Sequence, residues 1–162
     1  ISDAYENGVP MGSDLILEED QSPSFFIWAA KDPSKTSLQR IQIIKGWVED
    51  GEGKEAVIDV ACSDGLSVDP DTNRCPDNGA TVDLTNCEIT PDKGAKELSV
   101  NWRDNNFSQD LRAFYYVRVL ENPTCRWSTY DAIRAGVQPR PGMKATIQDR
   151  AWSSPIWYQP NT

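Results

Sequence analysis

The chain has 162 residues, with 16 Lys or Arg, 25 Asp or Glu and no His, which gives a formal net charge of −9. This length favours one domain with a hydrophobic core, and the longest apolar run, Phe25 to Ala30, is too short to cross a bilayer. The acidic balance argues against nucleic-acid binding, and the absence of His excludes Ser-His-Asp triads, Cys-His dyads and His-containing zinc sites within the chain, which argues against a self-sufficient hydrolase.

The first 21 residues are polar and contain Gly8, Pro10 and Gly12 close together. We expect a connector here, ending in a short strand at Leu15 to Leu17. Because the chain starts at Ile1 without an initiator Met or a signal segment, we also expect it to be a piece of a longer precursor. Residues 22–162 are then expected to form a single β domain.

Short apolar or alternating runs between turn residues predict strands over most of that domain. The run 38–48 changes phase at Ile44, which indicates either a bulge or burial on both faces, and a Gly-rich turn joins it to the next strand as a hairpin. Pro155 requires an edge or a bulge in the last strand, because proline has no N–H to donate. The predicted strands are 24–31, 38–48, 56–62, 97–103, 113–121 and 151–158, with one or two short ones within 81–89.

Two segments depart from this strand pattern. Ser128 to Ala135 starts with a capping Ser or Thr and is followed by Gly136, which predicts a short helix. Ser63 to Ala80 is dense in Asp, Pro, Asn and Gly and predicts a long irregular loop. The fold class that follows is mainly β: an antiparallel, immunoglobulin-like β-sandwich with long loops and one short helix.

The four cysteines, Cys62, Cys75, Cys87 and Cys125, include no CxxC pair. This spacing argues against a zinc site and against thioredoxin-type chemistry, and favours two disulfides in an exported protein. Sequence allows three pairings. We prefer Cys75 with Cys87, which bracket a turn-rich segment, and therefore Cys62 with Cys125. The alternative is four reduced thiols in a cytosolic protein.

The loop residues Asp69, Asp71 and Asn73 have the D-x-D-x-N spacing of calcium loops. The match ends there, because Arg74 occupies the position of the invariant Gly and Ala80 that of the bidentate Glu. We therefore read this segment as a solvated acidic loop and expect no metal, and keep the three residues only as weak calcium candidates.

Six tryptophans and five tyrosines raise the possibility of a sugar-stacking surface, although Trp in a small sandwich is more often a core residue. Arg126, Trp127, Tyr130 and Asp131 fall within six residues beside Cys125. Such a cluster either recognises a ligand or fastens a loop through Arg–carboxylate and Arg–aromatic contacts, and we favour fastening. The candidate binding residues are Trp102, Arg126, Trp127 and Tyr130, with Trp152 as a further exposed candidate. No catalytic pair of carboxylates can be assigned.

Five stretches carry a resemblance to a known family, and they keep their order along nearly the whole chain. Together they resemble the C-terminal part of a bacterial family, domain of unknown function 3604. The stretches are Asn7–Gly12, Arg40–Trp47, Ala113–Glu121, Arg126–Asp131 and Ser154–Tyr158.

The resemblance implies that full-length members are several times longer and that their N-terminal part is similar to the PHP superfamily of metal-dependent hydrolases. Since this chain has no His, none of that superfamily's metal ligands transfers to it. The resemblance therefore implies an accessory, non-catalytic β domain without a cofactor, exported, whose partner is the N-terminal domain of the same polypeptide. The alternatives are a carbohydrate- or ligand-binding module and a calcium-stabilised extracellular domain.

Overall fold

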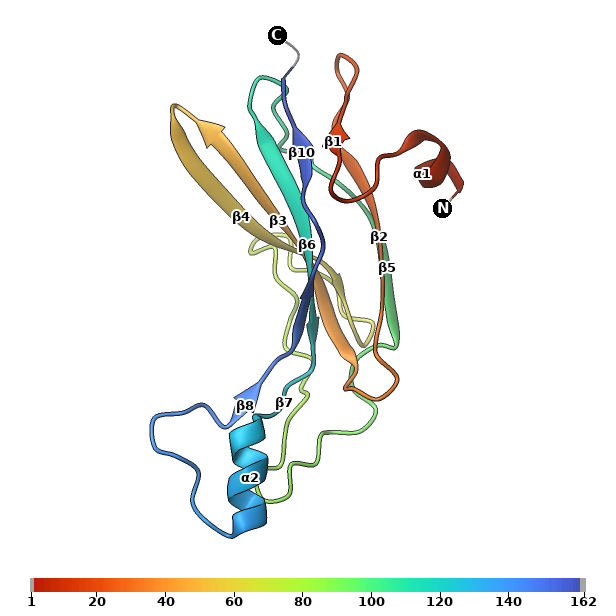
Figure 1. Ribbon diagram of the computed structural model, residues 1–162. Coiled ribbons are helices and arrows are strands. Elements are labelled where there is room, and N and C mark those ends of the chain that lie inside the picture. Colours follow the sequence, from red (N-terminus) through yellow and green to blue (C-terminus); the bar gives the residue numbers. More distant parts are fainter. Residues whose placement is uncertain (1, 161–162) are drawn as a thin grey trace.

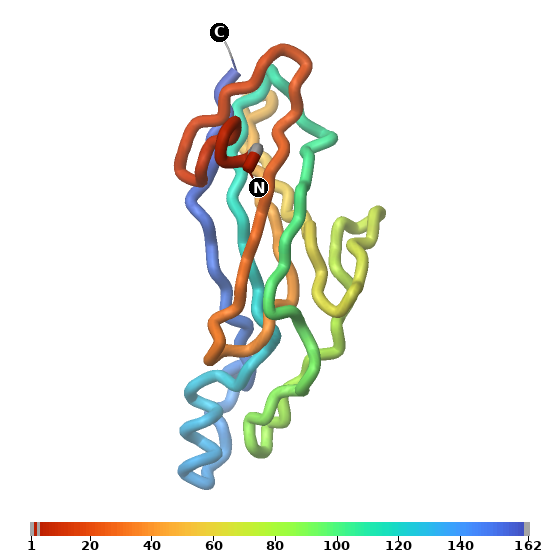
Figure 2. Tube along the Cα trace, turned by 90° about the vertical axis from the view of Figure 1, so that its right-hand side faces the viewer, coloured from red at the N-terminus to blue at the C-terminus, as the bar shows by residue number. Residues whose placement is uncertain are grey.

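A computed structural model describes residues 2–160, except for the side chain of Asp3. The molecule is elongated, with both termini at one end and a short helix at the other (Figures 1 and 2). Strands hold 40% of the residues and helices 9%, so the predicted mainly β class is confirmed. Neither helix in the described part is long and apolar enough to span a membrane.

The strands form one large sheet and two small ones. The large sheet has the order β1-β10-β6-β3-β4, with β9 also paired to β6; β2 pairs with β5, and β7 with β8. All pairs are antiparallel except β1 with β10. The elements are α1 Ser2–Asn7, β1 Asp14–Leu15, β2 Ser24–Ala30, β3 Leu38–Glu49, β4 Glu52–Cys62, β5 Glu97–Arg103, β6 Ala113–Glu121, β7 Thr124–Cys125, α2 Trp127–Ala135, β8 Thr146–Ile147, β9 Arg150–Trp152 and β10 Ile156–Tyr158.

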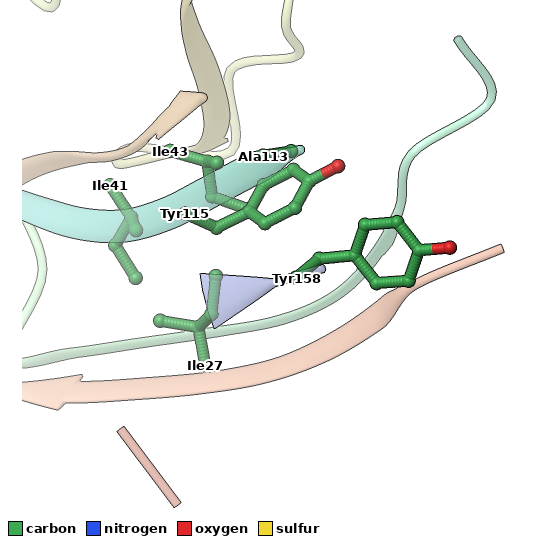
Figure 3. Packing of buried hydrophobic residues seen from close by; sticks show 6 residues of the cluster. All are labelled: Ile27, Ile41, Ile43, Ala113, Tyr115 and Tyr158. Atoms are coloured by element: carbon green, nitrogen blue, oxygen red, sulfur yellow. The ribbon is translucent and has the colours of Figure 1, made fainter. Parts of the chain in front are cut away.

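The hydrophobic core lies between the β2–β5 ribbon and one face of the large sheet. Ile27 of β2 faces Ile41 and Ile43 of β3 and Tyr115 of β6 (Figure 3). Alternate residues of β2 and β5 point into this space, as expected for strands with one buried face. Full burial of each of these large apolar side chains stabilises the fold by about 1.5–3 kcal/mol.

Strand β3 lies between β6 and β4, and it is buried on both faces. Ile43 and Ile44 are adjacent and both about 1% exposed, which explains the phase change in the sequence. A register shift against β4, typical of a bulge, lies between Ile41 and Gln42. The bulge and the burial on both faces therefore both occur, although the bulge precedes Ile44. On the outer face Gly46 lies under the ring of Phe114, where an added Cβ would come within 2.3 Å of the ring.

Several predicted elements are confirmed and others need correction. The helix begins at Trp127, and its N-cap residue is Arg126, whose side chain makes no cap, so the expected Ser or Thr cap is wrong. Gly136 ends the helix in the left-handed conformation, as predicted. The last expected strand is two strands, β9 and β10, separated by Ser153–Pro155. The first 21 residues contribute α1 and also β1, which pairs with β10.

The expected disulfide pairing is wrong, although all four cysteines are disulfide-bonded. Cys62 is bonded to Cys75 and Cys87 to Cys125, each with a Cα–Cα distance of 5.6 Å. The first bridge ties Cys75, in the second half of the 63–80 loop, back to the end of β4. The second joins the following loop to β7, next to α2. Turn residues between Cys75 and Cys87 indicated a local bridge, but the Cys75 N–H donates to the carboxylate of Asp59 on β4 at 2.8 Å, which holds Cys75 near Cys62 at the end of that strand.

Candidate functional site

Three of the four predicted binding residues lie at one cleft, at the end of the molecule that carries α2. Arg126, Trp127 and Tyr130 line it, together with residues from the 34–36 and 87–91 loops and from β7 and β8. Its volume is about 970 Å³. The Cys87–Cys125 disulfide lies in its wall and fixes the 87–91 loop to β7.

Backbone contacts, rather than the arginine side chain, hold this cluster in place. The Arg126 N–H donates to the Ala145 carbonyl at 2.8 Å, and the Thr129 hydroxyl donates to the same oxygen at 2.8 Å. The Arg126 carbonyl in turn accepts the N–H groups of Thr129 and Tyr130. The expectation that Arg126 fastens the loop through carboxylate or aromatic contacts is therefore wrong: its guanidinium makes neither contact within residues 2–160.

The cleft thus presents a cation and two aromatic rings to its interior and its rim. The side chain of Trp127 is 71% exposed, and Tyr130 is exposed beside it. The Nε of Arg126 is buried and has no hydrogen-bond partner in the described part of the chain. A buried guanidinium N–H without an acceptor is costly, so Arg126 keeps an unsatisfied donor beneath the surface of the cleft.

Acidic groups share the cleft with this cation. Asp149 lines it, and the adjacent Glu121 on β6 has a buried carboxylate oxygen without a hydrogen-bond partner among the described residues. Burial, reinforced by the negative charge of Asp149, raises the pKa of Glu121 above its ordinary value. Lys35 acts in the opposite direction. The walls of the cleft therefore carry both signs of charge.

Trp102, the fourth predicted binding residue, lies elsewhere and serves the core. Its ring is partly buried and packs on Phe25, with ring centroids 6.0 Å apart, and on Tyr115 at 6.5 Å. The prediction that Trp102 shares a surface with Arg126 is therefore wrong. The charged neighbours in the sequence, Arg103 and Asp104, suggested exposure, but alternation along β5 turns Trp102 inward.

The calcium candidates are arranged as a turn. The Asp69 carboxylate accepts the N–H groups of Asp71 and Thr72, and these hydrogen bonds hold its pKa below the ordinary value. The Asn73 carbonyl accepts the Asp59 N–H at 3.0 Å. No group of three His, Cys, Asp or Glu side chains suited to a metal occurs within the described residues. The solvated acidic loop stays the prediction and calcium binding its alternative, which fails if chelation leaves the melting temperature unchanged.

A second hollow, near the termini, was not found from the sequence. It is a groove of about 850 Å³ between the N-terminal segment, β2, β6 and the β9–β10 segment. Core residues Ile27, Ile43 and Tyr115 form part of its floor. No sequence pattern marks it, because its residues come from five separated segments. The one local signal was the uncharged run Phe25 to Ala30.

The groove is apolar in both its lining and its rim. Every described residue that lines it is uncharged, in a chain in which 25% of the residues are charged. Large apolar side chains stand exposed around it instead of being buried. These are Tyr5, Val9, Met11, Phe26, Trp28 and Trp152. Contiguous exposed apolar surface of this kind marks interaction sites on soluble proteins.

The most buried carboxylates of the chain are occupied by internal contacts. Asp104 pairs with Lys45 at 2.5 Å and accepts the Tyr115 hydroxyl at 2.7 Å. Burial and this hydrogen bond raise the pKa of Tyr115 well above its ordinary value. Asp59 accepts hydrogen bonds from the Gln42 amide and from the Cys75 N–H. Both carboxylates therefore take part in contacts that hold the sheet together.

Comparison with known proteins identifies the family of the chain. No curated protein and no solved structure matches it. The model of the family described as "Protein of unknown function (DUF3604)" matches residues 1–160, which is nearly the entire chain and includes both the cleft and the groove. The chain belongs to the DUF3604 family.

Proposed function

We propose that the chain is an accessory, non-catalytic domain of a larger polypeptide and that it packs against the preceding, PHP-like metal-dependent hydrolase domain. The observation that carries this proposal is the uncharged groove beside β2, with its rim of exposed apolar side chains. Such a surface suits a permanent contact within one polypeptide, because obligate interfaces resemble a core cut in half.

The contacts of the two buried carboxylates support a structural, non-catalytic role for this domain. Asp104 and Asp59 stabilise the packing of the sheet, and each is held by at least two internal partners. The chain has no His to serve as the commonest general base. Catalysis would then belong to the other domain, and this one would position or complete it.

The arrangement of strands supports an immunoglobulin-like sandwich. A two-stranded ribbon, β2–β5, faces the large sheet across the core, and β1 runs parallel to the last strand, β10. We also propose an exported location, since two disulfides persist in oxidising compartments.

The test compares hydrolase activity of the complete gene product with that of this chain alone. The proposal expects metal-dependent phosphoesterase turnover only when the upstream domain is present, and lower turnover or stability of that domain when residues 1–162 are deleted. Metal-dependent turnover by this chain alone would contradict the proposal.

A second function, binding of a carbohydrate or another small ligand, is favoured by the cleft beside α2. Trp127 offers one face for stacking, and Arg126 lines the same cleft with a positive charge. A glycan array followed by NMR titration tests this candidate. The expected result is perturbation of Trp127 and Tyr130 signals, lost in Trp127→Ala and retained in Trp157→Ala. No hit on the array, or perturbations away from the cleft, would remove it.

A further inference from the structure

The outer edge of β2 has backbone groups that no other strand uses. Strand β2 pairs only with β5 in the described part of the chain. The Lys31 N–H donates to the Lys96 carbonyl, and the Asp104 N–H donates to the Pro23 carbonyl. In this antiparallel register, odd-numbered residues of β2 therefore bond to β5.

The even-numbered residues consequently direct their N–H and C=O groups away from β5. These are Ser24, Phe26, Trp28 and Ala30, all of them exposed. Within residues 2–160, no backbone group outside the β2–β5 ribbon forms a hydrogen bond with them. This edge borders the apolar groove, which is lined by Phe25 to Trp28.

The edge lacks most of the features that protect free strand edges in proteins. Residues of the 4–11 segment line the same groove, but no backbone hydrogen bond joins these lining residues to β2 in the described part of the chain. Natural edge strands are kept from pairing by charged side chains, proline, bulges or a covering segment. Between Ser24 and Ala30 there is neither a charged residue nor a proline, and the register with β5 is continuous. An apolar edge of seven residues in this condition is a template for another strand.

We infer that β2 accepts an additional strand: an extended, uncharged segment of the adjoining domain that pairs with the edge of β2 and fills the groove. This inference rests on the proposed function for the identity of the partner. Main-chain hydrogen bonds to Phe26, Trp28 and Ala30 fix the segment, and alternate apolar side chains enter the groove above Ile43 and Tyr115. The uncharged lining selects against charged residues at those inward positions.

Amide hydrogen exchange of the complete gene product, compared with this chain alone, tests the inference. In the isolated chain we expect fast exchange at Phe26, Trp28 and Ala30. In the complete polypeptide these three amides should slow by at least about tenfold. The amides of Phe25, Ile27 and Ala29 bond to β5 in both cases and are the internal control.

Other outcomes separate this inference from the proposed function. If side-chain labelling of Trp28 and Tyr5 falls in the complete polypeptide while the three amides stay fast, the domains dock without strand addition. If neither changes, both proposals are overturned. If the amides slow in the isolated chain as its concentration rises, the occupant is a second copy, which also overturns the inference.

A pair of variants tests the backbone contact without disturbing the β2–β5 ribbon. Ala30→Pro removes an outward N–H, which an edge strand tolerates, and Ala30→Ser keeps it. In the complete polypeptide we expect Ala30→Pro to restore fast exchange at Trp28, and Ala30→Ser to behave as wild type. Equal protection in both variants would contradict strand addition at this edge. The melting temperature of each isolated variant confirms that the ribbon is intact.

Discussion

The groove beside β2 and the cleft beside α2 have similar volumes, about 850 and 970 Å³, but their walls carry different chemistry. The groove is uncharged and its floor belongs to the core, whereas the cleft contains Lys35, Glu88, Arg126 and Asp149 and is braced by a disulfide. The cleft is lined by residues of α2 and the groove by residues of α1, and these two helices lie toward opposite ends of the molecule (Figure 1). An apolar hollow open to the core suits a permanent protein contact, and a charged one on a rigid frame suits a reversible ligand.

The largest expected effect concerns the groove side, whose floor depends on a buried ion pair. Asp104 and Lys45 have side chains that are 4% and 9% exposed, and Asp104 also holds the Tyr115 hydroxyl. Asp104→Ala leaves Lys45 buried without its partner, so we expect the free energy of unfolding to fall by about 3–5 kcal/mol. Urea denaturation measures it, with the exposed Asp110→Ala as control. A loss similar to that of the control would show that the pair does not support the groove.

The next effect belongs to the cleft. The double variant Cys87→Ser/Cys125→Ser opens a loop of 38 residues, and we expect a loss of about 2–4 kcal/mol. Because the bridge lies in the cleft wall, amides of residues 87–91 should also exchange faster while those of β2 do not. Loosening of β2 to the same extent would mean that the two regions are not independent.

The sequence predicted individual strands correctly but not the contacts between distant segments. Alternation and turn residues predicted β2, β3, β5 and β6, because each pattern is local to one strand. The disulfide pairing and the position of Trp102 were predicted wrongly, since both depend on which segments the sheet brings together. Likewise, the groove combines the N-terminal segment with β2, β6 and β9, and no local pattern records that combination.

Two exposed tryptophans provide a matched comparison with smaller effects on stability. Trp28 is 63% exposed at the groove and Trp127 is 71% exposed at the cleft. Trp28→Lys and Trp127→Lys should each change the free energy of unfolding by no more than about 0.5 kcal/mol. Ligand binding at the cleft should be lost only in Trp127→Lys, as followed by NMR titration. Loss of ligand binding in Trp28→Lys would show that the groove and the cleft do not act independently.

The smallest effect is a pH dependence at the cleft. Because the pKa of Glu121 is raised in the folded chain, the folded state holds this proton more tightly than the unfolded state. Ionisation of Glu121 therefore lowers the free energy of unfolding as the pH rises above the ordinary glutamate pKa of 4.5. This loss of stability persists at neutral pH. Glu121→Gln should be more stable than wild type at pH 7 and converge with it below pH about 4. Melting temperatures across this range, with exposed Glu88→Gln as control, measure it. A constant difference at all pH values would contradict the burial of this charge.

The central claim is that the groove contacts the preceding domain. Its most direct test is to express that domain separately and to titrate it with this chain in a calorimeter. We expect association with a negative heat-capacity change, because apolar surface is buried. Trp28→Lys should weaken it by at least about tenfold, and Trp127→Lys should leave it unchanged. Association that is insensitive to Trp28→Lys but lost in Trp127→Lys would place the contact at the cleft and contradict the claim.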